Sequence, residues 1–149
     1  MAFRAIKSKT ARGGLTVETV NGFAGFGAAA ERSLRKTVEE TLEAAALAAR
    51  DSILNGPKSG AFYGDHQASA PGEAPANDDR HSGEHLADTI KPQMTGRLSG
   101  EVIATAPHAA VLEFGGVHVA PRPFLGPAIE QAKGELGEAV RDALHEALS

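Results

Sequence analysis

The histidines are the residues in this sequence whose spacing comes closest to a catalytic pattern. Of six histidines, His81 and His85 are four apart, the spacing at which two imidazoles on one helix can share a metal ion. The residues that would complete such a site are His66, Asp65, Asp79 and Glu84. In the order HSGEH, however, glutamate stands beside the second histidine, whereas the HEXXH motif of metalloproteases needs it beside the first. A small metal-dependent hydrolase is therefore an alternative hypothesis, and solvent-facing polar side chains are the interpretation that we favour.

No other stretch predicts catalysis or cofactor binding. The glycine-rich sequence GFAGFGAAAERS, residues 22–33, has the order G-x-x-G-x-G, whereas dinucleotide-binding turns have G-x-G-x-x-G. We interpret it as a flexible connection between a strand and a helix. The chain has no cysteine and no G-x-S-x-G elbow, so no nucleophile stands out. We therefore expect neither an enzyme nor a cofactor.

Length and charge restrict the remaining possibilities. The chain has 149 residues, the size of one ordinary domain, and two cores of about 70 residues each would both be marginal. We expect one domain over residues 1–149. A net charge of −4 argues against a dedicated nucleic-acid-binding protein. Residues 1–14 are instead basic and are expected to be a solvated strand or a flexible terminus. No apolar run approaches the roughly 20 residues of a membrane span, so we expect no membrane partner.

Two long stretches have apolar residues at every third or fourth position, the period of a helix. Residues 28–54 form the first stretch, which Gly56 and Pro57 end. Residues 126–148 form the second, with Pro127 in the first turn, where its missing N–H costs nothing. The apolar positions are Leu34, Val38, Leu42, Ala45, Ala49 and Ile53 in the first helix, and Ala128, Ile129, Ala132, Leu136, Val140, Ala143 and Leu144 in the second.

Outside these helices the apolar period shortens to that of strands. Strands are predicted at residues 2–7, 15–20, 89–93 and 99–106, with glycine-containing turns within each pair. Because strands and helices are segregated, we predict an α+β fold with a small antiparallel β-sheet flanked by two long helices. Residues 55–85 show little periodicity and are predicted to be a long loop of the same domain.

The most patterned segment is APHAAVLEFGGVHVAPRPFLGPA, residues 106–128. PHAAVLEFGG predicts a short helix that starts near Pro107 and ends at the glycine pair. The residues expected to share one face of this helix are Ala110, Val111 and Phe114. Glu113 lies among apolar neighbours and is expected to pair with Arg122. We interpret the segment as a corner that turns the chain from the sheet into the last helix, which is compatible with a contact to another subunit.

Taken in order, these motifs resemble a family of small tailed-phage proteins, the head–tail joining or tail-completion group of siphophages and their prophages, which includes neck and minor tail proteins. The shared order is a long helix, a SAPGEAP-type loop, a G-x-L-x-x-S/T-I element, a P-(H/Y)-A-x-x-x-E-F-G segment and an RPF-L-x-P-A entry into the last helix. Here the third element is Gly83 with Leu86, Thr89 and Ile90, and two residues separate glycine from leucine where the family has one. The resemblance covers about residues 28–149.

The resemblance implies a structural virion protein without enzymatic activity. It implies a fold similar to tail-terminator proteins and a six-fold homo-oligomeric ring at the neck or the upper end of the tail. The implied partners are further copies of the chain, head-closure or connector proteins, and the tail-tube or tail-terminator protein. Phage DNA would pass through the lumen without sequence-specific binding. Assembly would take place in the bacterial host cytoplasm. A phage interaction protein that never enters the virion is a further alternative.

The motif residues are also the candidate subunit interface. They are Ser69, Ala70, Pro71, Gly72, Pro75, Gly83, Leu86, Pro107, Glu113, Phe114, Gly115, Arg122, Pro123 and Phe124. In a ring, each copy presents one patch to a different patch on its neighbour. We expect the stretch ASAPGEAPAND, residues 68–78, to be ordered by docking on that neighbour. Pro71 and Pro75 would lower the entropy lost on docking.

Overall fold

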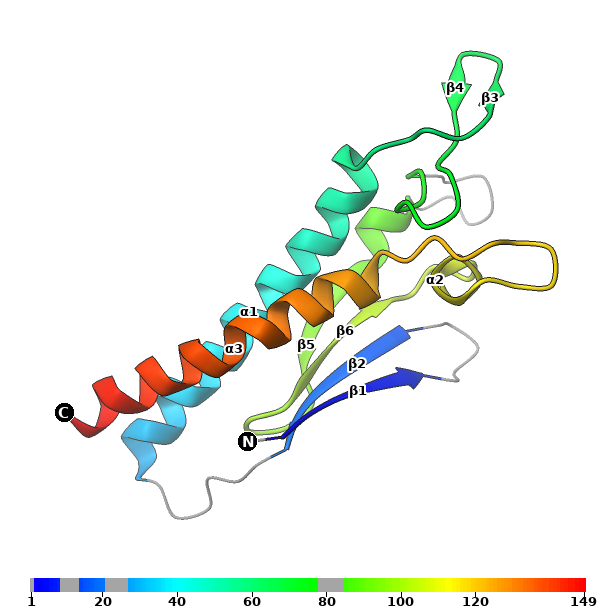
Figure 1. Ribbon diagram of the computed structural model, residues 1–149. Helices are drawn as coiled ribbons and strands as arrows, with labels where there is room; N and C mark the ends of the chain where they lie inside the picture. The colour runs from blue at the N-terminus through cyan, green and yellow to red at the C-terminus, as the bar shows by residue number, and fades with distance from the viewer. Residues whose placement is uncertain (1, 9–13, 21–26, 78–84) are drawn as a thin grey trace.

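The computed structural model describes residues 2–8, 14–20, 27–77 and 85–149, and for the first two of these ranges it describes the backbone. Within this part of the chain, a four-stranded sheet lies beneath two long helices (Figure 1). The elements are β1 (Ala2–Ser8), β2 (Gly14–Val20), α1 (Ala28–Asn55), β3 (Phe62–Tyr63), β4 (His66–Gln67), a 3₁₀ turn (Leu86–Thr89), β5 (Ile90–Met94), β6 (Gly100–Ala104), α2 (Ala109–Phe114) and α3 (Leu125–Leu148). The fold is α+β, as the sequence predicted.

The main sheet is antiparallel throughout, in the order β1-β2-β6-β5. The predicted N-terminal strands are present and pair over their full length, from Ala2 opposite Val20 to Ser8 opposite Gly14. The pairing between β2 and β6, which joins this N-terminal hairpin to the rest of the sheet, is short and consists of two residue pairs. At the outer edge, Arg50 of α1 donates to the Ile90 carbonyl, and Pro92 has no N–H to offer. The β5 edge is therefore partly closed.

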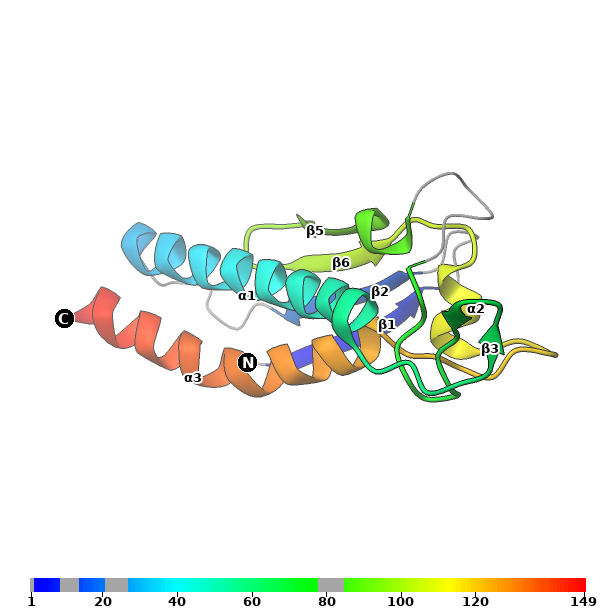
Figure 2. The same ribbon diagram turned by 90° about the horizontal axis from the view of Figure 1, so that it is seen from above.

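Alternation along β6 shows which face of the sheet the helices cover. Gly100, Val102 and Ala104 are buried, whereas Glu101 and Ile103 are intermediate in exposure. α1 packs against β5 and β6, and α3 packs against α1 and approaches β2. Both long helices lie on the same side of the sheet, as the two views show (Figures 1 and 2). β5 and β6 thus turn their buried positions towards one layer of helices.

The periodicity of the helices places the core where it was predicted. All six apolar positions expected in α1 are buried, and in α3 only Leu144 of the seven is partly exposed. The main buried cluster joins α1, β5, β6 and the first half of α3 with Ala74 of the long loop and Phe124. A second cluster, Leu34, Leu98, Leu136 and Val140, lies farther along the helix pair. Many of these residues are alanines, which let helices approach closely.

Candidate functional site

Three of the sequence motifs meet at one end of the molecule, which we call the loop end. It consists of residues 56–77, α2 and residues 115–124, and it lies beyond the last turn of α1 and the first turn of α3 (Figure 1). Two hydrogen bonds join residues 56–77, which we call the central loop, to residues 115–124. The N–H of Gly72 donates to the Pro121 carbonyl at 3.0 Å. The Nε of Arg122 donates to the Ser69 carbonyl at 3.2 Å.

The carboxylate of Glu113 caps the N-terminus of α3. Its Oε2 accepts the N–H groups of Phe124 and Leu125 at 2.8 and 3.0 Å, and its Oε1 accepts the N–H of Gly126 at 2.7 Å. The first N–H groups of a helix have no partner within the helix, and the helix dipole favours negative charge there. Glu113 is 8% exposed, so these are buried charge-assisted bonds. The EFG and RPFLGPA motifs are therefore two halves of one capping arrangement.

The predicted pairing of Glu113 with Arg122 is wrong. Glu113 is taken up by the three N–H groups of α3, and Arg122 turns instead to backbone carbonyls. Besides Ser69, the Arg122 side chain donates through Nη1 to Ala120 at 3.3 Å, and its own N–H donates to the Leu112 carbonyl at 2.6 Å. The prediction relied on opposite charge alone. The N-terminus of α3 binds the Glu113 carboxylate instead, because it presents several aligned N–H donors.

The central loop is held together by Glu73. Its Oε2 accepts the N–H groups of Ser59 and Ala70 at 2.9 and 2.8 Å, and its Oε1 accepts the Ser59 hydroxyl. The N–H of Glu73 returns a bond to the Ala70 carbonyl at 3.1 Å. These bonds, that of the Ser59 hydroxyl first, hold the pKa of Glu73 below its ordinary value. One carboxylate thus closes the base of the loop.

Farther out, the loop forms a small hairpin of β3 and β4. Tyr63 pairs with His66 across Gly64 and Asp65, and Gly64 has a φ of +68°, as a type II′ turn requires at its first central position. Below the hairpin, the N–H of Gly60 donates to the Ala68 carbonyl at 2.8 Å, and that of Ala68 donates to Ala61 at 3.0 Å. Phe62 and Tyr63 are 69% and 70% exposed. Two of the seven aromatic residues of the chain are therefore exposed at consecutive positions of one hairpin strand.

These contacts correct the expectation that residues 68–78 gain their order from a neighbouring subunit. Glu73, Arg122 and Pro121 of the same chain bind the loop, and Ser69, Ala74 and Pro75 are buried within it. Asn77 adds a further anchor, since its Oδ1 accepts the N–H of Ala87 at 2.9 Å. Asp78 lies outside the described residues. The loop is thus an ordered platform in the single chain.

α2 packs on a different face from the one predicted. Ala109 and Glu113 are buried, whereas Val111 is 43% exposed and Phe114 is 36% exposed. The helix ends at Gly115, whose φ of +79° favours glycine, and a Cβ there would lie 3.0 Å from the Val119 carbonyl oxygen. The tight loop that follows brings Val117 to 93% exposure. The sequence predicted the helix and its end but not its buried face. That face carries Glu113, whose partners are N–H groups at the start of α3.

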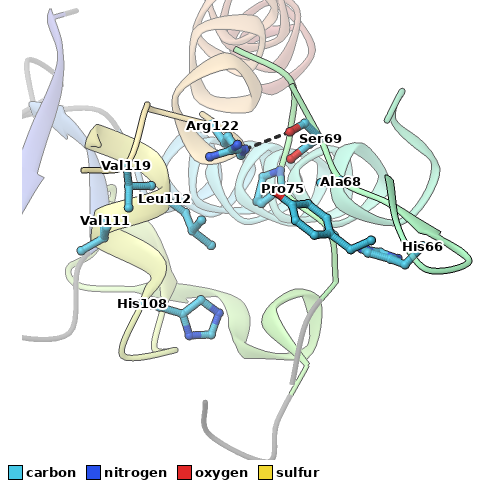
Figure 3. Close-up of a pocket in the computed structure, with 11 residues that line it drawn as sticks. His66, Ala68, Ser69, Pro75, His108, Val111, Leu112, Val119 and Arg122 are labelled. Carbon is cyan, nitrogen blue, oxygen red and sulfur yellow. Dashed lines mark hydrogen bonds between the residues drawn. The ribbon is translucent and has the colours of Figure 1, made fainter. Parts of the chain in front are cut away.

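A cavity of about 500 Å³ opens between the central loop and α2 (Figure 3). One wall is apolar and comes from Val111, Leu112 and Val119. On the facing side stand His66 and Pro75, while Arg122 and Ser69 lie between the walls, joined by their hydrogen bond (Figure 3). The residues that complete the lining are Tyr63, Ala68, Ala76 and His108. An apolar wall beside a guanidinium suits the binding of an apolar side chain with an acidic neighbour.

The predicted interface residues divide into two groups. Ser69, Pro75, Glu113 and Phe124 are buried within the loop end, and Leu86 is buried in the 3₁₀ turn before β5. Those left at or near the surface are Ala70, Pro71, Gly72, Pro107, Phe114, Gly115, Arg122 and Pro123, and Gly83 lies outside the described residues. The sequence reasoning missed Phe62 and Tyr63. Two adjacent aromatic residues within a polar loop, in a chain with few aromatics, could have indicated an exposed apolar surface.

The metal hypothesis finds no support among the described residues. In that part of the chain, no three His, Asp or Glu side chains gather closely enough to hold a metal ion. His66 and His85 are exposed. Asp79, His81 and Glu84 lie outside the described residues.

Comparisons of the chain with protein-family models, with curated proteins and with solved structures find no match. None of the described helices is both long enough and apolar enough to cross a membrane. The geometry of the loop end is therefore the basis for a functional proposal, together with the motif resemblance.

Proposed function

We propose that this chain is a structural virion protein of a tailed phage or prophage, a ring-forming subunit that joins head and tail or completes the tail. In this role it acts by self-association and docking, without chemistry. The ring is six-fold, and its neighbours are the head-closure or connector proteins on one side and the tail-tube or tail-terminator protein on the other. DNA passes through its lumen without sequence-specific binding.

The observation that carries this proposal is the convergence of the motif segments at the loop end. The resemblance rests on motifs of which the loop motif, residues 69–75, precedes the other two by about thirty residues or more, and the contacts of Glu113, Arg122 and Gly72 bind them into one structure. That structure presents Phe62, Tyr63 and Val117 to solvent. Exposed apolar residues on a rigid support are typical of a protein–protein interface.

The fold also supports a ring subunit. A head-to-tail ring needs two different patches on each copy, and an elongated domain with a projecting end provides them. The helix layer is acidic where it meets solvent, with Glu135, Glu138 and Asp142 exposed along α3. Negative surfaces do not hold DNA, which suits a subunit around a DNA channel.

Deletion of the gene from its phage or prophage tests the proposal. Electron microscopy of the resulting lysate should show filled heads beside unjoined or malformed tails, and a plasmid copy should restore complete particles. Mass spectrometry of purified virions should detect the chain. Normal infectious particles from the deletion would refute the proposal, and absence of the chain from purified virions would favour the non-virion alternative.

A further inference from the structure

We propose that the cavity between the central loop and α2 is a docking site for a partner protein, and that it takes an acidic segment with one apolar side chain. The apolar side chain lies against Val111, Leu112 and Val119, and the neighbouring carboxylate pairs with Arg122. At about 500 Å³, the cavity is within the size range of ligand-binding sites. Because it lies within one chain, this site does not depend on the proposed ring, and its binding can be measured on the purified chain alone.

The charge of the lining indicates an acidic occupant. The basic side chains that line the cavity are Arg122, His66 and His108, and the described lining residues include no Asp or Glu. The remaining described lining is mostly apolar. An interface is selective when its charges meet opposite charges on the partner, and a basic partner would here meet arginine. The cavity thus favours a carboxylate beside an apolar group.

The acids of the loop end lie outside this lining. The carboxylates of Glu73 and Glu113 are turned onto backbone N–H groups of the same chain. Asp65, in the turn of the hairpin, is exposed, so solvent and salt screen its charge. Residues 78–84 lie outside the described part of the chain. Within that part, the cavity therefore presents the positive charge of Arg122 to an occupant.

Arg122 is held in place and keeps N–H donors for a carboxylate. A guanidinium has five N–H groups in a planar fork that matches the two oxygens of a carboxylate. Within the described part of the chain, its Nε and Nη1 donate to the carbonyls of Ser69 and Ala120, and neither acceptor carries a charge. The guanidinium lies at one end of the cavity, beside the apolar wall, and His108 lies at the other end (Figure 3). Arginine beside an apolar contact is typical of the residues that dominate protein interfaces.

Both walls of the cavity are fixed by bonds within the chain. The N–H of Gly72 in the central loop donates to the Pro121 carbonyl at 3.0 Å, and the N–H of Arg122 donates to the Leu112 carbonyl of α2 at 2.6 Å. Residues 121 and 122 therefore tie the loop wall to the α2 wall. A site that is formed before binding loses less conformational entropy when the partner docks.

The open side of the cavity favours a partner protein over other anionic ligands. Tyr63 and Val111 line the cavity and are 70% and 43% exposed. A small molecule is usually enclosed over most of its surface, which this open cavity does not offer. A nucleic acid is held through several phosphates, whereas the described lining contains one arginine and no lysine. A side chain that projects from a protein needs only an open entrance, an apolar wall and one charge.

Selection of peptides on the purified chain tests the proposal without assuming a partner sequence. A displayed library of random short peptides is first depleted on Val111→Asp, which sets a carboxylate in the apolar wall, and is then selected on the parent chain. The enriched peptides should carry Asp or Glu next to a large apolar residue. Enrichment of basic peptides, or no enrichment at all, would overturn the proposal.

Matched variants then locate the binding. The most enriched sequence, made as a fluorescein-labelled peptide, should bind Val111→Asp about tenfold or more weakly than the parent, because like charges then meet in the cavity. Val117→Asp, the same change at an exposed position outside the lining, should bind like the parent. Arg122→Gln should also weaken binding by about tenfold or more. Arg97→Gln changes the net charge equally, in the turn between β5 and β6, and should not.

The same variants decide whether the occupant is the one proposed. Thermal denaturation verifies that each variant is folded, and Val111→Asp should be folded because the parent side chain is partly exposed. Equal losses in Val111→Asp and Val117→Asp would overturn the site. Self-association of the parent that is lost in Val111→Asp, or tighter binding of a labelled oligonucleotide than of the peptide, would overturn the choice of occupant. The deletion phenotype tests the virion role independently, so peptide binding by a chain whose deletion leaves normal particles would refute the ring alone.

Discussion

At the scale of residues, Glu113 does for α3 what a serine or aspartate does for most helices, but from another helix. An ordinary N-cap side chain lies beside the helix it caps and accepts one N–H. Glu113 is eleven to thirteen positions earlier in the chain and accepts three. It thereby fixes the angle between α2 and α3, and with it the direction in which the loop end projects.

Replacing Glu113 should therefore destabilise the fold strongly. Glu113→Ala leaves three N–H groups without a partner and should lower the free energy of unfolding by about 2–4 kcal/mol, measured by urea denaturation. Glu113→Gln keeps one acceptor oxygen and should lose less. Glu138→Ala, on the exposed face of α3, should stay within about 0.5 kcal/mol of the parent. A loss at Glu113 no larger than at Glu138 would contradict the capping role.

Glu73 makes the central loop sensitive to acid. Its pKa in the folded chain lies below its ordinary value of 4.5, so its contribution to loop stability is fully present above that value and is lost as the pH falls through the folded pKa. Because the Ser59 hydroxyl is the largest cause, Ser59→Ala should raise the pKa of Glu73, as followed by NMR titration of its carboxyl group. Ser99→Ala, in the distant β5–β6 turn, should not. An unmoved pKa in Ser59→Ala would show that the bond is not formed in solution.

At the scale of elements, the sequence predicted what depends on periodicity and missed what depends on partners. α1 and α3 begin and end within one residue of the predicted bounds, because long apolar stripes and the Gly56-Pro57 stop are local features. The inward face of α2 could not be found in the same way. α2 is six residues long, and the residue that sets its orientation, Glu113, is an acid whose partners lie at the start of α3. The order of the central loop likewise depends on contacts with Pro121 and Arg122, some fifty residues later.

Two glycines of α3 should respond oppositely to the same substitution. A Cβ on Gly126 would lie 2.8 Å from Oε1 of Glu113, whereas one on Gly134 would meet nothing within 4 Å. Gly126→Ala should therefore destabilise the chain by disturbing the cap. Gly134→Ala should stabilise it by up to about 1 kcal/mol through helix propensity. Thermal denaturation of both variants measures the difference, and a stabilising Gly126→Ala would contradict the geometry of the cap.

The anchoring of the central loop by Arg122 can be measured directly. Arg122→Ala removes the bond to the Ser69 carbonyl, and a hydrogen bond to a charged group contributes about 1.5–3 kcal/mol. Local opening should rise by about tenfold or more, seen as faster hydrogen exchange at Ala70 and Gly72. Arg97→Ala, at the far turn between β5 and β6, should leave those amides unchanged. Unaltered exchange in Arg122→Ala would mean that the Arg122 bond does not hold the loop.

At the scale of the whole molecule, the chain combines a tightly packed body with one projecting, partly apolar end. The body was foreseeable from the sequence because its core is drawn from regular stripes. The shape of the loop end was not, since it arises where segments distant in sequence are joined by Glu113, Glu73 and Arg122. The sequence did indicate which segments are involved, because three of the motifs that carry the phage resemblance meet there.

A cryo-EM map of the neck of the assembled particle tests the central claim most directly. The account predicts a closed ring of this chain, six-fold in symmetry, at the head–tail junction or the upper end of the tail. A complete neck and tail that contain no copy of the chain would contradict the account.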